Sequence, residues 1–210
     1  MTTVLQDLRM IAGANSAADR RDASPSGEAV AFRSDAALAT EAAAGSHDAF
    51  NLLVDRYADR VFGLLRHRCP TSEDAEDAVQ ETFLGAWRSI CRYDPRRPFS
   101  SWLFAIAVRR AASAERTRRR RITRATGADS ADRQHRDTEP RDRDDAIWAA
   151  AKQHLPPRTV TLLWLVYAEG LTPTAAAEVV GSTSVLVRVT LHRARKKLAL
   201  LVDDPAGCTP

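Results

Sequence analysis

The sequence predicts an all-α protein of two small helical domains, an N-terminal bundle and a C-terminal helix-turn-helix unit, joined by a flexible charged linker. Three observations predict it. Apolar residues recur every three or four positions between residues 46 and 121, which gives each helix one buried side. Nearly every residue from 122 to 144 is polar or charged, so no apolar stripe continues there. Beyond residue 145 the helical spacing returns and ends in two helices separated by a glycine turn.

Residues 1–45 form an N-terminal extension that we expect to be mostly disordered, because it contains few large apolar residues. The first strongly patterned helix begins at His47 and should end at Pro70, since proline stops a helix. Its apolar stripe needs helical partners and comprises Phe50, Leu53, Val54, Tyr57, Val61, Leu64 and Leu65.

A second helix is predicted after Thr71, which lies three residues before Asp74 in the spacing of a capping box. Several acidic residues lie near its N-terminal end, where the helix dipole favours negative charge. The side expected to be buried carries Val79, Phe83, Trp87 and Ile90. A different face carries Asp77, Gln80, Glu81 and Leu84. These residues either solvate the helix or dock a partner, and periodicity alone leaves both interpretations open.

A short loop and a third helix follow, both rich in arginine and aromatic residues. Pro95 and Pro98 predict the loop because they lack an amide donor and disfavour helix before them. The helix should start with Ser100 or Ser101 as its cap and run to residue 121. Arginines surround it at Arg92, Arg96, Arg97, Arg109 and Arg110, and six more lie between residues 116 and 124.

This density of arginine favours contact with nucleic-acid phosphates, because each neutralised phosphate releases counterions. A solvated tail is the alternative interpretation. The rings of Phe99, Trp102 and Phe104 are either core residues or surfaces on which unpaired bases stack. We assign Phe104 to the core and keep Phe99 and Trp102 as candidates for base contact.

The C-terminal part has helical spacing from Asp145 to His154 and again from Val160 to Gly170, the expected left-handed C-cap. Thr172 then caps a short helix with Pro173 in its first position, and a second helix runs from residue 184 to 201. This pattern predicts a helix-turn-helix motif. Its second helix should bury Val187, Leu191, Ala194 and Leu198 and turn Arg188, His192, Arg195 and Lys196 toward phosphates.

Composition excludes several classes of function. The formal net charge of +4 is concentrated in residues 46–121, which carry fifteen arginines against ten acids. Cys69, Cys91 and Cys208 fit neither a disulfide framework nor a zinc site, which indicates a reducing cytoplasm and no metal. No signal peptide or apolar run of about 18 residues is present, so no membrane insertion is expected. The sequence lacks a phosphate-binding loop and a nucleophile–base constellation, so we expect neither an enzyme with catalytic residues nor a cofactor.

Four segments in order resemble a family: DAEDAVQETFLGAW, RYDPRRPFSSWLFAIAVRR, LPPRTVTLLWLVYAEGLTPTAAAEVVG and LHRARKKL. Together they look like an extracytoplasmic-function sigma factor of the sigma-70 family, over about residues 46–202. The resemblance implies a sigma factor that binds core RNA polymerase and promoter DNA and is regulated by an anti-sigma factor. It divides the chain into the extension (1–45), region 2 (46–121), a linker (122–144), region 4 (145–202) and a tail (203–210).

The resemblance also implies roles for individual residues. It implies that the surface of this chain that docks onto the clamp helices of the polymerase large subunit carries Asp77, Gln80, Glu81 and Leu84. The minus-ten element would be opened and read by Arg92, Arg96, Arg97, Phe99, Trp102, Arg109 and Arg110. The minus-thirty-five element would be read by Ser184, Val185, Arg188, Val189, Thr190, His192, Arg193 and Arg195.

The recognition helix departs from the family pattern, because Thr190 stands where an arginine donor is expected. Bidentate reading of guanine needs Arg or Lys, so base contact should be weak or unusual. Val185 and Val189 then either contact thymine methyl groups or lie against an inhibitory partner. The alternative functions are a helix-turn-helix regulator that binds an operator without polymerase, and an interaction module whose basic run is only solvated.

Overall fold

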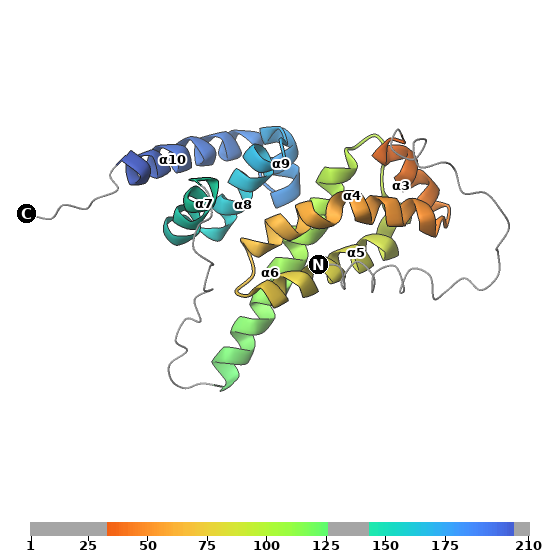
Figure 1. Ribbon diagram of the computed structural model, residues 1–210, viewed down its shortest axis with the longest axis horizontal. Coiled ribbons are helices and arrows are strands. Elements are labelled where there is room, and N and C mark those ends of the chain that lie inside the picture. The colour runs from red at the N-terminus through yellow and green to blue at the C-terminus, as the bar shows by residue number, and fades with distance from the viewer. Residues whose placement is uncertain (1–32, 126–142, 204–210) are drawn as a thin grey trace, which may run out of the picture.

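The structure, a computed structural model, describes residues 33–125 and 143–203, and within these ranges every regular element is a helix (Figure 1). This confirms the all-α prediction. The elements are α3 (Asp35–Ala43), α4 (His47–Arg66), α5 (Ser72–Ser89), η1 (Ile90–Arg92), α6 (Phe99–Ala125), α7 (Arg143–His154), α8 (Pro157–Leu163), η2 (Trp164–Ala168), α9 (Pro173–Val180) and α10 (Ser184–Asp203).

Helix α3 occupies the end of the predicted N-terminal extension, where no helix was predicted; residues 1–32, on which the prediction of disorder mainly rests, lie outside the described part. Ser34 caps it by accepting the amide of Ala37, and Leu38 is fully buried. Asp35 accepts hydrogen bonds from Tyr57 Oη at 2.5 Å and Arg56 Nη1 at 2.7 Å. Burial and this carboxylate raise the pKa of Tyr57 well above its usual value. The helix is therefore held by α4 rather than by its own composition.

The cap predicted for α5 is where the sequence placed it. The Thr71 hydroxyl accepts the amide of Asp74 at 3.0 Å and donates to its carboxylate at 2.9 Å. Along α5, Val79, Phe83 and Ile90 are buried, while Trp87 is half-buried against the ring of Phe50. The predicted buried side of α5 is thus confirmed.

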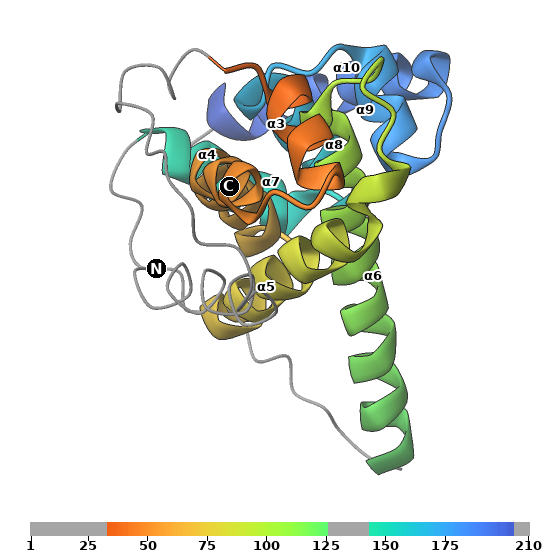
Figure 2. The ribbon, with the colours of Figure 1, turned by 90° about the vertical axis from the view of Figure 1, so that its right-hand side faces the viewer.

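Helix α6 begins at Phe99, one or two residues earlier than the serine caps predicted. The carbonyl of Pro98 accepts the amide of Trp102, so the proline opens the helix. Helices α4, α5 and α6 then enclose a core of fully buried side chains: Leu53, Val61, Leu64, Leu65, Phe83, Leu103 and Phe104. The second half of α6 projects beyond the other helices (Figure 2). Because α6 reaches Ala125 and α7 starts at Arg143, helix occupies both ends of the predicted linker, whose residues 126–142 lie outside the described part.

The C-terminal helices form the predicted helix-turn-helix motif. Thr172 caps α9 by accepting the amide of Ala175, and Pro173 occupies its first position. Gly181 ends α9 with φ of 62°, in the left-handed region that glycine adopts without strain. Helices α9 and α10 meet at 103°, within the usual range of the motif. Before them, Gly170 turns the chain with φ of 69°.

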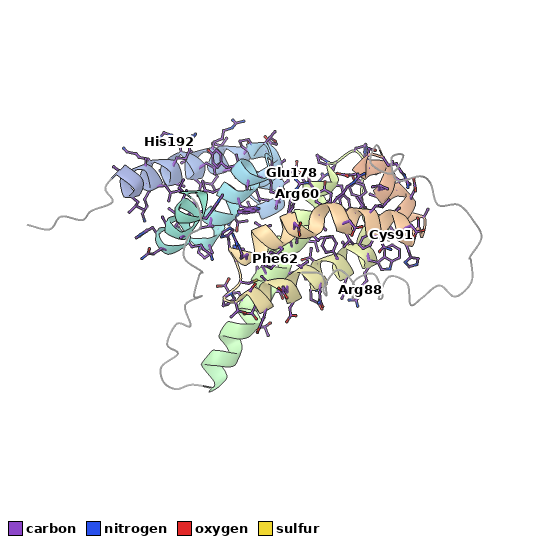
Figure 3. The ribbon with its side chains drawn as sticks, in the orientation of Figure 1. Arg60, Phe62, Arg88, Cys91, Glu178 and His192 are labelled. Atoms are coloured by element: carbon purple, nitrogen blue, oxygen red, sulfur yellow. The ribbon has the colours of Figure 1, made fainter. Side chains whose placement is uncertain are left out.

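The two halves of the protein are packed together rather than separate, and α9 lies against α6 (Figures 1 and 2). Glu169 is the centre of this junction, with its side chain only 4% exposed. Its carboxylate accepts hydrogen bonds from Arg60 Nε at 2.7 Å and from the indole of Trp164 at 3.3 Å. Figure 3 labels Arg60 on α4 and Glu178 on α9, at the two sides of the junction.

Gly63 makes room for this junction. A methyl group on its Cα would lie 2.5 Å from Cζ2 of Trp164, whose ring also packs against His67 and Trp148. Such an approach is far inside van der Waals contact, so the indole would have to move.

Gly63→Ala should therefore separate the two halves, although alanine favours the helix by about 1 kcal/mol over glycine. We expect a larger radius of gyration by small-angle X-ray scattering. Gly85→Ala is the matched control, because its new methyl group meets the movable end of Arg110 at 2.9 Å. A scattering curve for Gly63→Ala that superimposes on that of the wild type would contradict the role given to this glycine.

Candidate nucleic-acid interface

The acidic face of α5 comprises Asp77, Gln80, Glu81 and Leu84, which follow one another at helical spacing. Asp77 and Glu81 are exposed, and Gln80 and Leu84 are half-buried, so a partner can reach the face. Asp77 and Glu81 also line a groove of about 660 Å³ between α5 and α6, whereas Gln80 and Leu84 lie outside its lining. The structure thus brings the two carboxylates to one groove.

The groove joins the acidic face to the arginines of α6. Arg110 Nη1 lies 3.6 Å from the carboxylate of Glu81, in a pair exposed on both sides. An exposed pair of this kind contributes about 0–1 kcal/mol, so a stronger partner can take either side chain. Gly85 lies under the guanidinium and leaves it room. Cys69, also in the lining, has its thiol pKa raised by burial to about 11, so it stays neutral at physiological pH.

The loop between η1 and α6 holds two of the predicted minus-ten arginines, Arg96 and Arg97, in exposed positions. Arg96 donates to Asp94 at 2.9 Å, and these hydrogen bonds lower the pKa of the Asp94 carboxyl. Arg97 lies 3.5 Å from Glu178 on α9, in an exposed pair between the two halves. Arg92 and Arg109 are exposed as well. The side chains beyond Thr117, including most of the arginine run, lie outside the described part.

Among the three aromatic candidates, Phe99 is a correction. Its side chain is only 3% exposed, with ring centroids 5.3 Å from Tyr57 and 5.6 Å from Tyr93, so no base can stack on it. Phe104 is fully buried, which confirms its assignment to the core. Trp102 is half-buried, packs on Phe99 at 5.6 Å, and keeps part of its ring accessible. It remains the aromatic candidate for base contact.

Helix α10 presents most of its predicted contact residues to solvent. Val187, Leu191 and Ala194 are buried against the neighbouring helices, as predicted, whereas Leu198, predicted with them, is half-buried. Figure 3 shows His192 on the side of α10 turned away from α7 and α8. Of the predicted set, Ser184 and Thr190 are half-buried, while Val185, Arg188, Val189, His192, Arg193 and Arg195 are exposed.

Sequence reasoning missed some residues of these surfaces. Leu186 is 57% exposed beside Val185, and its position next to the predicted contact residues could have indicated it. Glu178 and Glu169 were not predicted because their partners, Arg97 and Arg60, lie about eighty and more than a hundred positions away. No local sequence signal identifies pairs at that separation.

Residues 33–125 and 143–203 show neither a metal site nor a membrane-spanning helix. These residues contain no group of three or more His, Cys, Asp or Glu placed to hold a metal ion. No single helix among them is long and apolar enough to cross a bilayer; α9 and α10 together have the length and composition but are bent by 103°.

Comparisons with known proteins match both halves to one family. Residues 53–121 match sigma-70 region 2, and residues 146–198 match sigma-70 region 4. The RNA polymerase sigma factor CarQ of Myxococcus xanthus is 32% identical over 163 residues, covering 76% of this chain and 92% of CarQ. The ECF RNA polymerase sigma factor BldN of Streptomyces coelicolor is 31% identical over 174 residues, covering 80% of this chain and 66% of BldN.

Other relatives are matched over a smaller share of their length. CnrH of Cupriavidus metallidurans is 38% identical over 85 residues, covering 40% of this chain and 44% of CnrH. The matched part thus spans less than two thirds of the length of BldN and of CnrH. Among solved structures, CnrH in complex with the cytosolic domain of CnrY has a TM-score of 0.63 at 29% identity, covering 82% and 99% of the two chains. RpoE of Bartonella quintana, solved in complex with the anti-sigma factor NepR, has a TM-score of 0.61 at 20% identity, covering 73% of this chain and 96% of RpoE. At this identity the likeness supports only the fold.

Proposed function

Because this chain belongs to the extracytoplasmic-function group of the sigma-70 family, we propose that it binds core RNA polymerase and directs initiation at specific promoters. The observation that carries the proposal is an exposed acidic face and an exposed helix-turn-helix in one chain, in the order of regions 2 and 4. Two linked modules suit two spaced promoter elements, since the second contact benefits from a high effective concentration.

Each half of the protein has its own proposed binding role. The α5 face docks on the polymerase through Asp77, Gln80, Glu81 and Leu84. The exposed arginines around the start of α6 hold the phosphates of the minus-ten region, and Trp102 supplies the ring that stacks on an unpaired base. Helix α10 enters the major groove at the minus-thirty-five element.

This family consists of transcription initiation factors, not enzymes. We propose the same for this chain: it catalyses no reaction of its own, and RNA polymerase catalyses RNA synthesis. Its place of action is the cytoplasm, where polymerase and chromosome meet.

The packed arrangement of the two halves supports regulation by an anti-sigma factor. Arg97, a candidate for minus-ten contact, is paired with Glu178 of the helix-turn-helix. DNA binding at both elements would have to break this pair and move α9 away from α6. CnrH, a relative with a similar fold, was solved in complex with the cytosolic domain of CnrY. A partner that holds the packed arrangement would keep this protein from promoters.

The test is transcription in vitro with the full chain and core polymerase on a library of promoter sequences. We expect the chain to co-purify with core polymerase and to produce transcripts from a defined set of start sites. Core polymerase alone is the control. A chain that protects promoter DNA by itself and never co-purifies with polymerase would be the stand-alone regulator instead, and the proposed function would be wrong.

A further inference from the structure

Three large apolar side chains form an exposed patch on the first half of α10. Val185 is 67% exposed, Leu186 57% and Val189 40%. Burying such side chains is favourable, so their exposure costs stability that a bound partner can recover. The patch therefore indicates an apolar target, although the exposed residues that follow it from His192 to Lys197 are basic.

The patch points straight out of the protein. Successive residues of an α-helix are about 100° apart, which puts Val185 and Val189 within about 40° of each other. The same spacing puts them opposite Val187 and Leu191, the residues that α10 buries. The two valines therefore contribute nothing to the core, and Leu186 lies at the edge of the patch.

Cations surround the patch and identify the charge of its partner. Arg188 and Arg195 lie on one side of the outward face and Arg193 on the other, all of them exposed. No acidic residue occurs between Ser184 and Val202. A partner that fits this helix must be polyanionic and must present small apolar groups between its charges.

The order of residues along the outward face favours DNA over an anionic membrane surface. A membrane-binding helix keeps an apolar face along its length, with cations on the opposite face. Here the outward face is apolar at Val185 and Val189, becomes basic at His192 and Lys196, and carries the exposed Leu200 only one turn later. That order suits a recognition helix, whose N-terminal residues meet base edges while later ones meet phosphates.

The major groove of DNA offers one apolar group, the 5-methyl group of thymine. In the N-terminal part of α10 the exposed guanidinium of Arg188 lies to the side of the outward face rather than between the two valines. The Thr190 hydroxyl donates to the carbonyl of Leu186 at 2.8 Å, so its proton is used inside the helix. The Thr183 hydroxyl accepts the amide of Leu186 at 3.3 Å as the cap of α10.

We propose, resting on the function proposed above, that Val185 and Val189 read thymine methyl groups in the upstream promoter element. The flanking arginines hold the adjacent phosphates and set the register of the helix. The protein should then prefer thymine at the contacted positions. A chain with an arginine at position 190 would prefer guanine there.

The experiment removes the methyl groups and nothing else. Thymines of the upstream element, in a promoter found by the library screen, are replaced one at a time by deoxyuridine, which keeps every hydrogen-bonding group. Binding of the holoenzyme is measured at one fixed salt concentration, because affinity for DNA depends steeply on salt. Replacing a contacted thymine by deoxyuridine should lower the affinity about threefold to fivefold, because the contact with about one methyl group is lost.

A matched pair of variants connects the effect to the two valines. In V185A/V189A the affinities for thymine and deoxyuridine promoters should become equal, and the exposed positions leave the fold intact. Leu200→Ala is the control, because Leu200 is 65% exposed on the same helix but far from its N-terminal end. This control should keep the full preference for thymine.

The proposal is overturned if every deoxyuridine promoter binds as tightly as its parent while transcription from the parent proceeds normally; the proposed function then stands. It is also overturned if V185A/V189A retains the preference for thymine. Binding to anionic phosphatidylglycerol vesicles that disappears in V185A/V189A, without any deoxyuridine effect, would assign the patch to a membrane surface. Absence of any start site in the library would instead overturn the proposed function itself.

Discussion

Reversing both carboxylates of the acidic face, in the variant D77R/E81R, should reduce promoter-dependent transcription by about 100-fold or more. Both side chains are exposed at one groove, where, within the described part, Glu81 makes only the exposed ion pair with Arg110. Hot-spot residues of an interface cost about 2–4 kcal/mol each when lost, and like charges brought together add to that cost. About 2.8 kcal/mol corresponds to a 100-fold loss in binding.

The measurement is a titration of core polymerase with each variant in the transcription assay, at several concentrations. Excess D77R/E81R should recover part of the activity, since the defect lies in binding. The control D55R/D59R makes the same change of charge at two exposed acids that are also four residues apart, in the middle of α4 and outside the acidic face. Equal activity of D77R/E81R and wild type at limiting concentration would remove these residues from the docking surface.

Phe83→Ala should be the most destabilising of the changes considered, at about 3–5 kcal/mol. Its ring is fully buried between α5 and α4, where it meets Phe50 edge-on at a centroid distance of 6.5 Å. Truncation to alanine leaves a cavity that the surrounding helices fill only in part. Because Phe83 holds α5 in place, the acidic face on the other side of the helix should lose its fixed position as well.

Thermal unfolding followed by circular dichroism measures this effect. For a structured part of this size, each kcal/mol lowers Tm by about 2–4 °C, so a fall of about 6–20 °C is expected. Arg88→Ala, at an exposed position of the same helix, is the control and should stay within about 0.5 kcal/mol of wild type. A Tm for Phe83→Ala equal to that of the control would show that this ring is not part of the core.

Much of the local structure follows from neighbouring residues. Thr71 and Thr172 cap their helices because a hydroxyl three residues before an amide can accept its hydrogen bond. Gly181 ends α9 because glycine tolerates a positive φ. The helix-turn-helix was predictable for the same reason, since every signal that defines it lies within a few residues.

The features that the sequence left unpredicted depend instead on residues that are distant in the chain. Helix α3 contains one large buried residue, Leu38, and is held by contacts of Asp35 with Arg56 and Tyr57 some twenty positions away. Phe99 was open to two interpretations because periodicity does not reveal which rings surround it. The packing of the two halves through Glu169 and Arg60 joins residues more than a hundred positions apart.

The amino-acid sequence by itself determined the helical class, most helix ends, the acidic and basic faces and the apolar first half of α10. Only the tertiary structure decided that Phe99 is buried, that Arg97 pairs with Glu178, and that Gly63 admits Trp164. The physical reason is that hydrogen bonding, capping and hydrophobic period act within a few residues of one helix. They specify which side of a helix is apolar, whereas the neighbour that covers this side is selected by packing among distant segments.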